Sequence, residues 1–193
     1  MLEFGKQSSG SSDNIIVQKV KIADVEITYG TKQDWQKYAD DIGINLTLDV
    51  GQSFQPKMYI GGSFKIDEVN NSVSGWGRAF KVKMLFDAIG LPIKLAKGSA
   101  VVDNRLPENA KNHIIGKEFA RLSYKSTGVK ADGDNRWVDW QDTEKLGNEN
   151  ILKDKFKKSV SEGYVKNFLE PNGKEEDSWQ EKQVSDGLNG VPL

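Results

Sequence analysis

The sequence predicts a mainly β fold: a small, curved β-barrel with one helix inserted before the last hairpin and a second helix after it. Several short segments alternate between apolar and polar side chains, which is typical of half-buried strands. Glycines interrupt these segments, and a glycine inside a strand usually marks a bend or a bulge. Two other segments repeat their apolar residues at helical spacing. The same periodicity is also compatible with a two-sheet sandwich.

The first part of the chain predicts one strand system preceded by a polar segment. Residues 1–14 are rich in glycine and serine, so we expect them to be disordered. Residues 15–29 predict one long strand or two short ones. Their apolar parity slips near Ala23 and Asp24, which indicates a bulge or a sharp bend. Residues 31–41 are interpreted as a short helical turn.

Two further strands follow. Residues 42–50 alternate most cleanly in the chain, with isoleucine, leucine and valine on one face and polar side chains on the other. Residues 57–66 place Met58 and Ile60 on an apolar face. The glycine pair at 61 and 62 predicts a bend, a bulge or a close approach of another backbone.

A helix is predicted from about Arg78 to Ile89, because its apolar residues fall at helical spacing and Gly90 stops it. The last two strands, residues 117–126 and 135–141, form a hairpin. In its first strand Ala120, Leu122 and Tyr124 are expected to face the core. Lys117, Phe119, Arg121 and Lys125 are expected to face the other way.

The chain beyond the hairpin divides into a helix and a tail. Residues 149–169 carry an apolar stripe that recurs every four residues, from Leu152 to Phe168, which predicts an amphipathic helix packed on the barrel. We therefore expect an OB-fold-like domain over 15–148, a helix over 149–170 and a flexible acidic tail over 171–193. Residues 170–193 hold six acids and two lysines, so the rest of the chain is basic, with 25 basic and 22 acidic residues. Such a tail can occupy a basic groove or recruit a partner protein.

Composition narrows the classes of function. The chain contains no cysteine, which excludes disulfides and thiolate chemistry, and no apolar run long enough to span a membrane. We expect an intracellular protein, without a membrane, a metal or another cofactor. The single histidine, His113, has no neighbouring carboxylate in sequence, and Asp132 and Asp134 lack the remaining ligands of a calcium loop. Catalysis is not expected.

The strongest functional signal is the mixture of cations and aromatic rings on the predicted outer faces. Single-stranded nucleic acid requires both, because cations contact phosphates and rings stack on unpaired bases. We predict that nine residues bind nucleic acid: Lys57, Tyr59, Lys65, Trp76, Arg78, Arg121, Lys125, Arg136 and Trp137. Trp137 and Trp140 have opposite parity, so one should be exposed and the other buried. Trp35, Phe64 and Phe80 are assigned to the core.

Three pieces of the sequence resemble single-stranded DNA-binding proteins of tailed bacteriophages, which are OB-fold proteins. Residues 78–90 (RAFKVKMLFDAIG) resemble the helix of that group, and residues 114–124 (IIGKEFARLSY) resemble its following strand. The acidic tail with its apolar tip resembles tails that recruit partners, although it ends in Pro192 and Leu193 rather than in an aromatic residue.

This resemblance implies sequence-tolerant binding and protection of single-stranded DNA during phage replication or recombination, in the host cytoplasm. It also implies that replication or recombination proteins are candidate partners of the tail. Two other classes stay open. A phage virion or assembly protein could use the same β-domain without binding nucleic acid, and exposed tryptophans also serve carbohydrate-binding domains.

Overall fold

A computed structural model describes residues 14–34, 36–93, 106, 109–131 and 133–171. Trp35 and almost all of the predicted N-terminal segment and acidic tail lie outside these residues. Among the described residues, no helix is long and apolar enough to cross a membrane.

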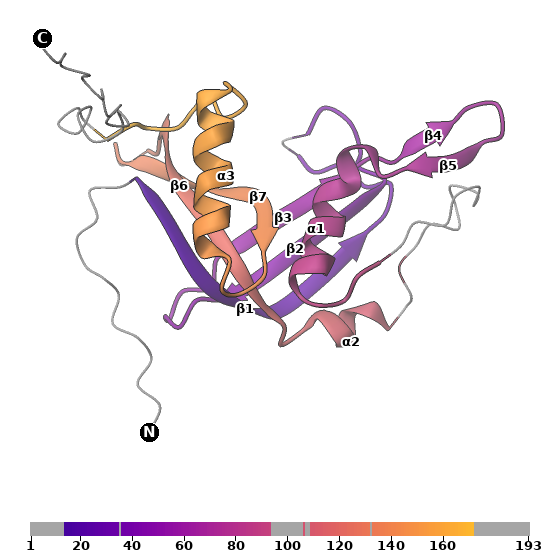
Figure 1. The fold of residues 1–193 in the computed structure, drawn as a ribbon, viewed down its shortest axis with the longest axis horizontal. Coiled ribbons are helices and arrows are strands. Elements are labelled where there is room, and N and C mark those ends of the chain that lie inside the picture. Colours follow the sequence, from indigo (N-terminus) through magenta and orange to yellow (C-terminus); the bar gives the residue numbers. More distant parts are fainter. Residues whose placement is uncertain (1–13, 35, 94–105, 107–108, 132, 172–193) are drawn as a thin grey trace, which may run out of the picture.

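Five antiparallel strands form one strongly curved sheet in the order β3-β2-β1-β6-β7, which closes almost into a barrel (Figure 1). These strands are β1 (Ile15–Thr28), β2 (Ile42–Asp49), β3 (Lys57–Gly62), β6 (Glu118–Val129) and β7 (Asn135–Glu144). A three-strand meander is thus followed by a helix and a hairpin, and β6 returns beside β1. This arrangement confirms the predicted mainly β, OB-fold-like barrel.

The remaining elements decorate this sheet. Strands β4 (Lys65–Asp67) and β5 (Ser72–Gly75) form a separate hairpin that projects from the barrel (Figure 1). Within the described residues the helices are the 3₁₀ turn η1 (Gly77–Ala79), α1 (Phe80–Ala88), α2 (Ala110–Ile114) and α3 (Glu149–Ser161). The helix expected near 78–89 is therefore confirmed, while α2 is a short helix that the sequence analysis did not predict.

The bulge predicted in the first strand is present and lets β1 serve two neighbours. Ile22 pairs with Leu48 and Asp24 with Thr47, so Ala23 is an extra residue in β1. Ile22 and Val25 are both buried despite their opposite parity. The N-terminal half of β1 pairs with β6 and its C-terminal half with β2, which bends the sheet into a barrel.

The predicted strand over 57–66 is divided in two by close backbone packing. β3 ends at Gly62, and a methyl group added to Gly62 would lie only 2.4 Å from the carbonyl carbon of Arg78. Only a residue without a side chain allows the backbone of η1 to pack against the end of β3. The chain then leaves the barrel sheet and enters the β4–β5 hairpin.

Two predicted helical segments differ from the structure. Residues 31–41 form a loop closed by an isolated bridge between Thr31 and Asp40, rather than a helical turn. Helix α3 ends at Ser161, well before the predicted end, because Gly163 adopts the left-handed conformation (φ +75°) that terminates helices. As a result Tyr164 is 79% exposed instead of continuing the buried stripe.

Strand β6 is buried on both of its faces, which corrects the expectation that one face meets solvent. Phe119 is fully buried with the barrel core, on the face that was expected to be exposed. On the other face Ala120 and Leu122 pack with Leu152 and Phe156 of α3. The helix thus covers the hairpin as a second small core.

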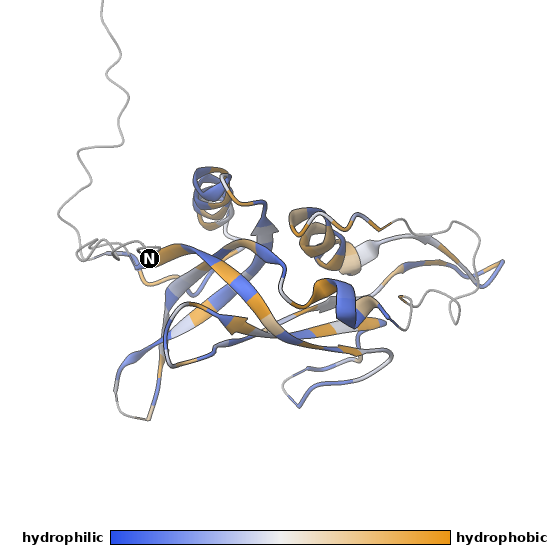
Figure 2. Ribbon diagram, turned by 90° about the horizontal axis from the view of Figure 1, so that it is seen from below, coloured by the Kyte–Doolittle hydropathy of each residue, from blue (hydrophilic) through white to orange (hydrophobic). Residues whose placement is uncertain are grey.

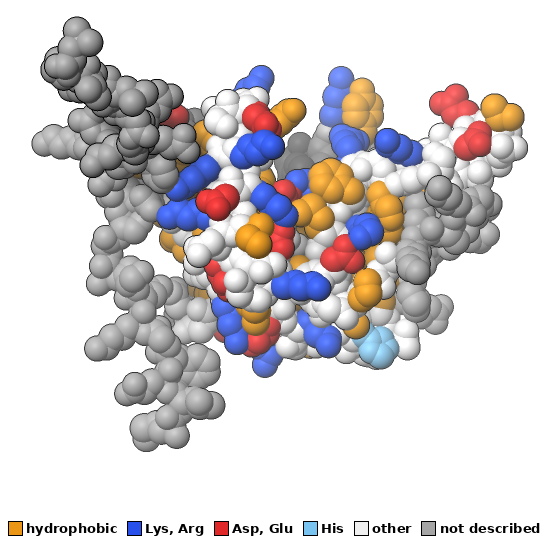
Figure 3. All heavy atoms as spheres, in the orientation of Figure 1, with side chains coloured by type: hydrophobic (Ala, Val, Ile, Leu, Met, Phe, Trp, Pro, Cys, Tyr) orange, Lys and Arg blue, Asp and Glu red, His pale blue; other side chains and the backbone are white. Residues whose placement is uncertain are grey.

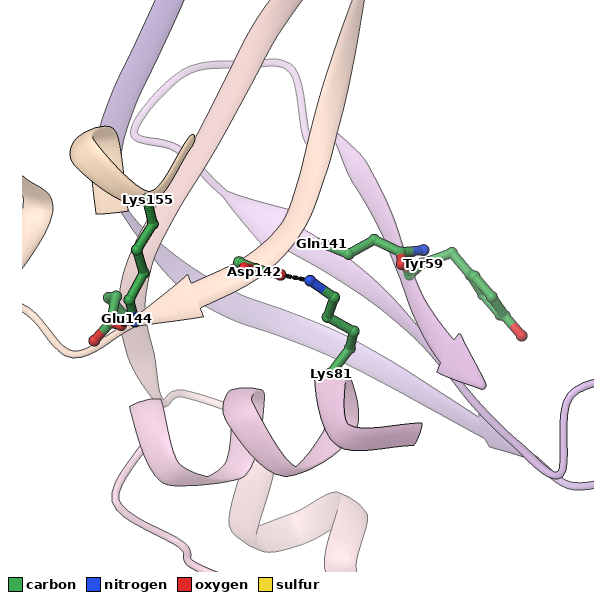
Figure 4. A network of polar contacts seen from close by, with 6 residues as sticks. All are labelled: Tyr59, Lys81, Gln141, Asp142, Glu144 and Lys155. Atoms are coloured by element: carbon green, nitrogen blue, oxygen red, sulfur yellow. Dashed lines mark hydrogen bonds and ion pairs between the residues drawn. The ribbon is translucent and has the colours of Figure 1, made fainter. Parts of the chain in front are cut away.

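Strand β7 closes the barrel mainly through side chains (Figure 4). Gln141 Nε2 donates a hydrogen bond of 3.4 Å to the Tyr59 carbonyl oxygen on β3. The next residues reach the helices: Asp142 forms an ion pair with Lys81 of α1, and Glu144 one with Lys155 of α3. The register is irregular here: between the pairs Arg121–Thr143 and Ser123–Asp139, β7 has three residues where β6 has one, and Gln141 and Asp142 belong to this extra stretch.

Candidate nucleic-acid interface

The outer face of β2 and β3 carries an aromatic ring laid over two glycines. Gly43 and Gly61 are directly paired across these strands. A methyl group added to Gly43 would lie 2.7 Å from Tyr59 Oη, and one added to Gly61 would lie 2.5 Å from it. The ring of Tyr59 therefore lies across both glycines, while its neighbours Met58 and Ile60 are buried in the barrel. We call Tyr59, Gly43 and Gly61 the platform.

The hydroxyl group of Tyr59 is held by a buried carboxylate. It donates a hydrogen bond of 2.6 Å to Asp40 Oδ2, and Asp40 is only 7% exposed. Burial of the ring, followed by the hydrogen bond and the charge of Asp40, raises the pKa of Tyr59 to about 12. The neighbouring Asp41 is also part of the fold, since its carboxylate accepts a hydrogen bond of 2.7 Å from the backbone N–H of Phe64.

Two loops flank the barrel on the side of this platform. The β1–β2 loop (residues 29–41) presents Tyr38, which is 65% exposed, with Lys37 Nζ 5.2 Å from its ring centre. The β6–β7 loop (residues 130–134) leads into Arg136 and Trp137, both exposed. In Figure 2 both loops extend from the sheet away from α1 and α3. OB-fold barrels bind single strands on this combination of the second and third strands with these two loops.

The opposite face, which carries α1 and α3, is mixed in charge (Figure 3). Its lysines are largely matched by acids: four ion pairs join Lys81 to Asp142, Lys83 to Asp87, Lys155 to Glu144 and Lys158 to Glu162. A polyanion would have to compete with these carboxylates. The platform side is therefore the better candidate for nucleic acid.

The nine predicted site residues fall into separate groups. Lys57 and Tyr59 lie on the platform face of β3. Lys125 is paired with Trp137 across the β6–β7 hairpin, next to Arg136. A third group lies at the β4–β5 hairpin and the turn into α1: Lys65, Trp76 and Arg78. Trp76 is half-buried and packs on Phe64 with ring centres 5.7 Å apart.

The two tryptophans of β7 divide as their parity predicted. Trp137 is 45% exposed. Trp140 packs into the second core, where its ring centre lies 5.4 Å from that of Phe156 of α3. Trp137 is therefore the residue of this strand that can stack on a base.

Arg121 was expected to face solvent, and this expectation is wrong. The residue is 8% exposed, and its Nε donates a hydrogen bond of 2.7 Å to Asp139 Oδ1. Burial raises the pKa of Asp139, and the positive charge of Arg121 opposes that rise. Arg121 thus neutralises a buried carboxylate and is not placed to contact a phosphate.

Sequence reasoning also missed several residues. Phe80, assigned to the core, is 45% exposed with Lys81 Nζ 4.8 Å from its ring centre, because it lies at the first turn of α1 rather than on its inner face. Gly43 could have been identified from the sequence, because it is a glycine at an outward position of a cleanly alternating strand, where a side chain would be expected. Nothing in the sequence identified Asp40, because it lies in a loop and its partner, Tyr59, is nineteen residues away on β3.

A scan against protein-family models and a search of curated proteins found no match to this chain. Among the residues that the structure describes, no three His, Asp or Glu side chains gather to hold a metal ion.

Proposed function

We propose that the chain binds and protects single-stranded DNA without strong sequence preference. The observation that carries this proposal is the platform: a tyrosine ring held across paired glycines on the outer face of β2 and β3, between two loops that carry cations and exposed rings. The resemblance to phage proteins suggests replication or recombination as the setting.

The proposed mechanism combines stacking with phosphate neutralisation. A base stacked on Tyr59 or Trp137 would be held by its π-face, which every base has, and each such contact is worth about 1–3 kcal/mol. Lys57 lies two residues before Tyr59 on the same face of β3, Lys125 is paired with Trp137, and the exposed Arg136 precedes Trp137 in β7; these three cations would contact the phosphates. Both kinds of contact are indifferent to the identity of the base, so binding should tolerate any sequence.

Oligothymidine binding, followed by fluorescence at two salt concentrations, tests the proposal. We expect tight binding at low salt, a steep loss on adding salt, and weak binding of duplex DNA. Tyr59→Ala and Trp137→Ala should each weaken the free energy of oligothymidine binding by about 1–3 kcal/mol, with little change in its salt dependence. Tyr164→Ala is the matched control, since Tyr164 is more exposed than either ring but lies beyond α3.

Failure to bind oligothymidine at low salt would reject the proposal and favour a virion or assembly role. If Tyr59→Ala and Tyr164→Ala lose the same amount of oligothymidine affinity, the platform is not the binding face.

A further inference from the structure

Asp40 joins the β1–β2 loop to the platform through one carboxylate oxygen. Oδ2 accepts a hydrogen bond from Tyr59 Oη at 2.6 Å and one from Gln36 Nε2 at 2.5 Å. The first partner lies on β3 and the second within the loop. At 7% exposed, the residue is shielded from water, so these hydrogen bonds do not compete strongly with solvent.

The platform glycines are needed for this arrangement. A methyl group added to Gly61 would lie 2.8 Å from Asp40 Oδ2 as well as 2.5 Å from Tyr59 Oη. Gly61 therefore makes room for the ring and the carboxylate together. The backbone of Asp40 is also fixed, because its N–H donates to the Thr31 carbonyl oxygen at 3.3 Å and closes the loop.

The anchored segment carries exposed groups suited to nucleic acid. Lys37 and Tyr38 lie between Gln36 and Asp40, the donor and the acceptor of the same hydrogen bond. Fixing both ends of this short segment limits where Lys37 and Tyr38 can lie relative to the ring of Tyr59.

We propose that Asp40 is a positioning residue, which holds the Tyr59 ring over the paired glycines and fixes Lys37 and Tyr38 beside it as one preorganised binding unit. This inference rests on the proposed function. An acidic residue would then promote the binding of a polyanion, because fixing side chains in advance removes an entropic cost of binding.

The direction in which oligothymidine affinity changes when Asp40 is replaced separates positioning from electrostatics. If Asp40 acted through its charge alone, Asp40→Ala and Asp40→Asn would both tighten oligothymidine binding at low salt. Positioning predicts instead that Asp40→Ala weakens binding by about 3- to 10-fold with an unchanged salt slope. Asp40→Asn should recover most of this loss, because its amide oxygen still accepts from the tyrosine hydroxyl.

Two further measurements complete the test. In a Tyr59→Phe background, which keeps the ring and removes the hydroxyl, Asp40→Ala should have a much smaller effect than in the wild type. Spectroscopic titration, in which comparison with Tyr59→Phe identifies the step that belongs to Tyr59, should show its pKa falling below about 12 in Asp40→Ala, while the part of the rise caused by burial of the ring stays. This titration needs a folded variant but no DNA, so it reads the contact directly.

The outcomes distinguish the two proposals. If Tyr59→Ala weakens binding and Asp40→Ala leaves it unchanged or tightens it, the positioning role is wrong and the binding function stands. If the wild type does not bind oligothymidine, both fail. If Asp40→Ala unfolds the protein, the folded Asp40→Asn variant decides: binding tighter than that of the wild type overturns positioning, and binding near the wild-type level supports it.

Discussion

Glycine at positions 43 and 61 determines what the outer face of this barrel can present. In most strands an outward side chain at either position would lift a neighbouring ring off the sheet. Here the missing side chains let Tyr59 lie flat across two strands, with its hydroxyl reaching Asp40. The interior of the same strands is unaffected, because Ile42, Ile44 and Ile60 fill the barrel from the other face.

Gly43→Ala is expected to weaken oligothymidine binding while leaving the fold intact. Its new methyl group would meet Tyr59 Oη at 2.7 Å and Thr28 Oγ1 at 2.8 Å, and both groups belong to side chains that can turn away. We expect the loss to approach that of Tyr59→Ala, at a stability cost below about 1.5 kcal/mol. Gly75→Ala is the control, since its methyl group would meet only Lys65, at 3.6 Å. Unchanged binding in Gly43→Ala would show that ring placement does not matter.

The two cations of β6 are expected to behave differently, although they belong to one strand. Arg121→Met leaves Asp139 without its partner inside the protein, so unfolding in urea should show a loss of about 3–5 kcal/mol. Lys125→Ala should leave stability nearly unchanged and lower the salt slope of oligothymidine binding by about one. A full-strength salt slope in Lys125→Ala would remove that residue from the interface.

Individual elements differ in how well the sequence predicts them. Local patterns were sufficient for β2, whose clean alternation matches its burial, and for the bulge at Ala23, which the slip in parity revealed. Helix α3 covers one face of β6, and the two elements are far apart in the chain, so the local pattern of β6 does not indicate this contact. The sequence therefore predicted one buried and one exposed face for β6, although both are buried. Arg121 was misplaced for that reason. The platform was predicted only in part, since Tyr59 was identified but Asp40 was not.

Closure of the barrel through β7 gives a prediction about α1. The two carboxylates are similarly buried, with Asp142 13% and Glu144 16% exposed, but their lysines differ: Lys81 is 21% exposed and Lys155 is 46% exposed. Lys81→Met should therefore lower the free energy of unfolding by an amount at the lower end of about 3–5 kcal/mol, because it leaves the buried carboxylate of Asp142 without its partner. Lys155→Met should cost only about 0–1 kcal/mol, because Lys155 is half exposed and Glu144 keeps a hydrogen bond of 3.4 Å from the side-chain amide of Asn148. Urea unfolding measures both, and equal costs would contradict this account of closure. Replacing both partners, with Lys81→Met and Asp142→Leu, should recover much of the loss.

At the scale of the whole molecule, charge is divided along the chain. Residues 170–193 hold six acids and two lysines, and the remainder holds 25 basic and 22 acidic residues. The structure adds that part of the basic charge is not available to a polyanion, because Arg121 is buried and the lysines of α1 and α3 are largely paired. The cations beside the platform and on the β6–β7 hairpin are thus where an acidic segment would compete with DNA.

Deletion of residues 171–193 should accordingly tighten oligothymidine binding at low salt. A tethered acidic segment competes at high effective concentration even when each contact is weak, and salt screens that competition. The gain should therefore shrink as salt is added, and the melting temperature should stay the same. A matched variant that replaces the acids of this segment with Asn and Gln, while keeping Val191, Pro192 and Leu193, should reproduce the gain. If only the deletion tightens binding, the effect depends on the apolar tip or on the length of the segment rather than on its charge. If neither variant changes the affinity at low salt, self-competition is excluded, and recruitment of a partner protein becomes the role to test for these residues.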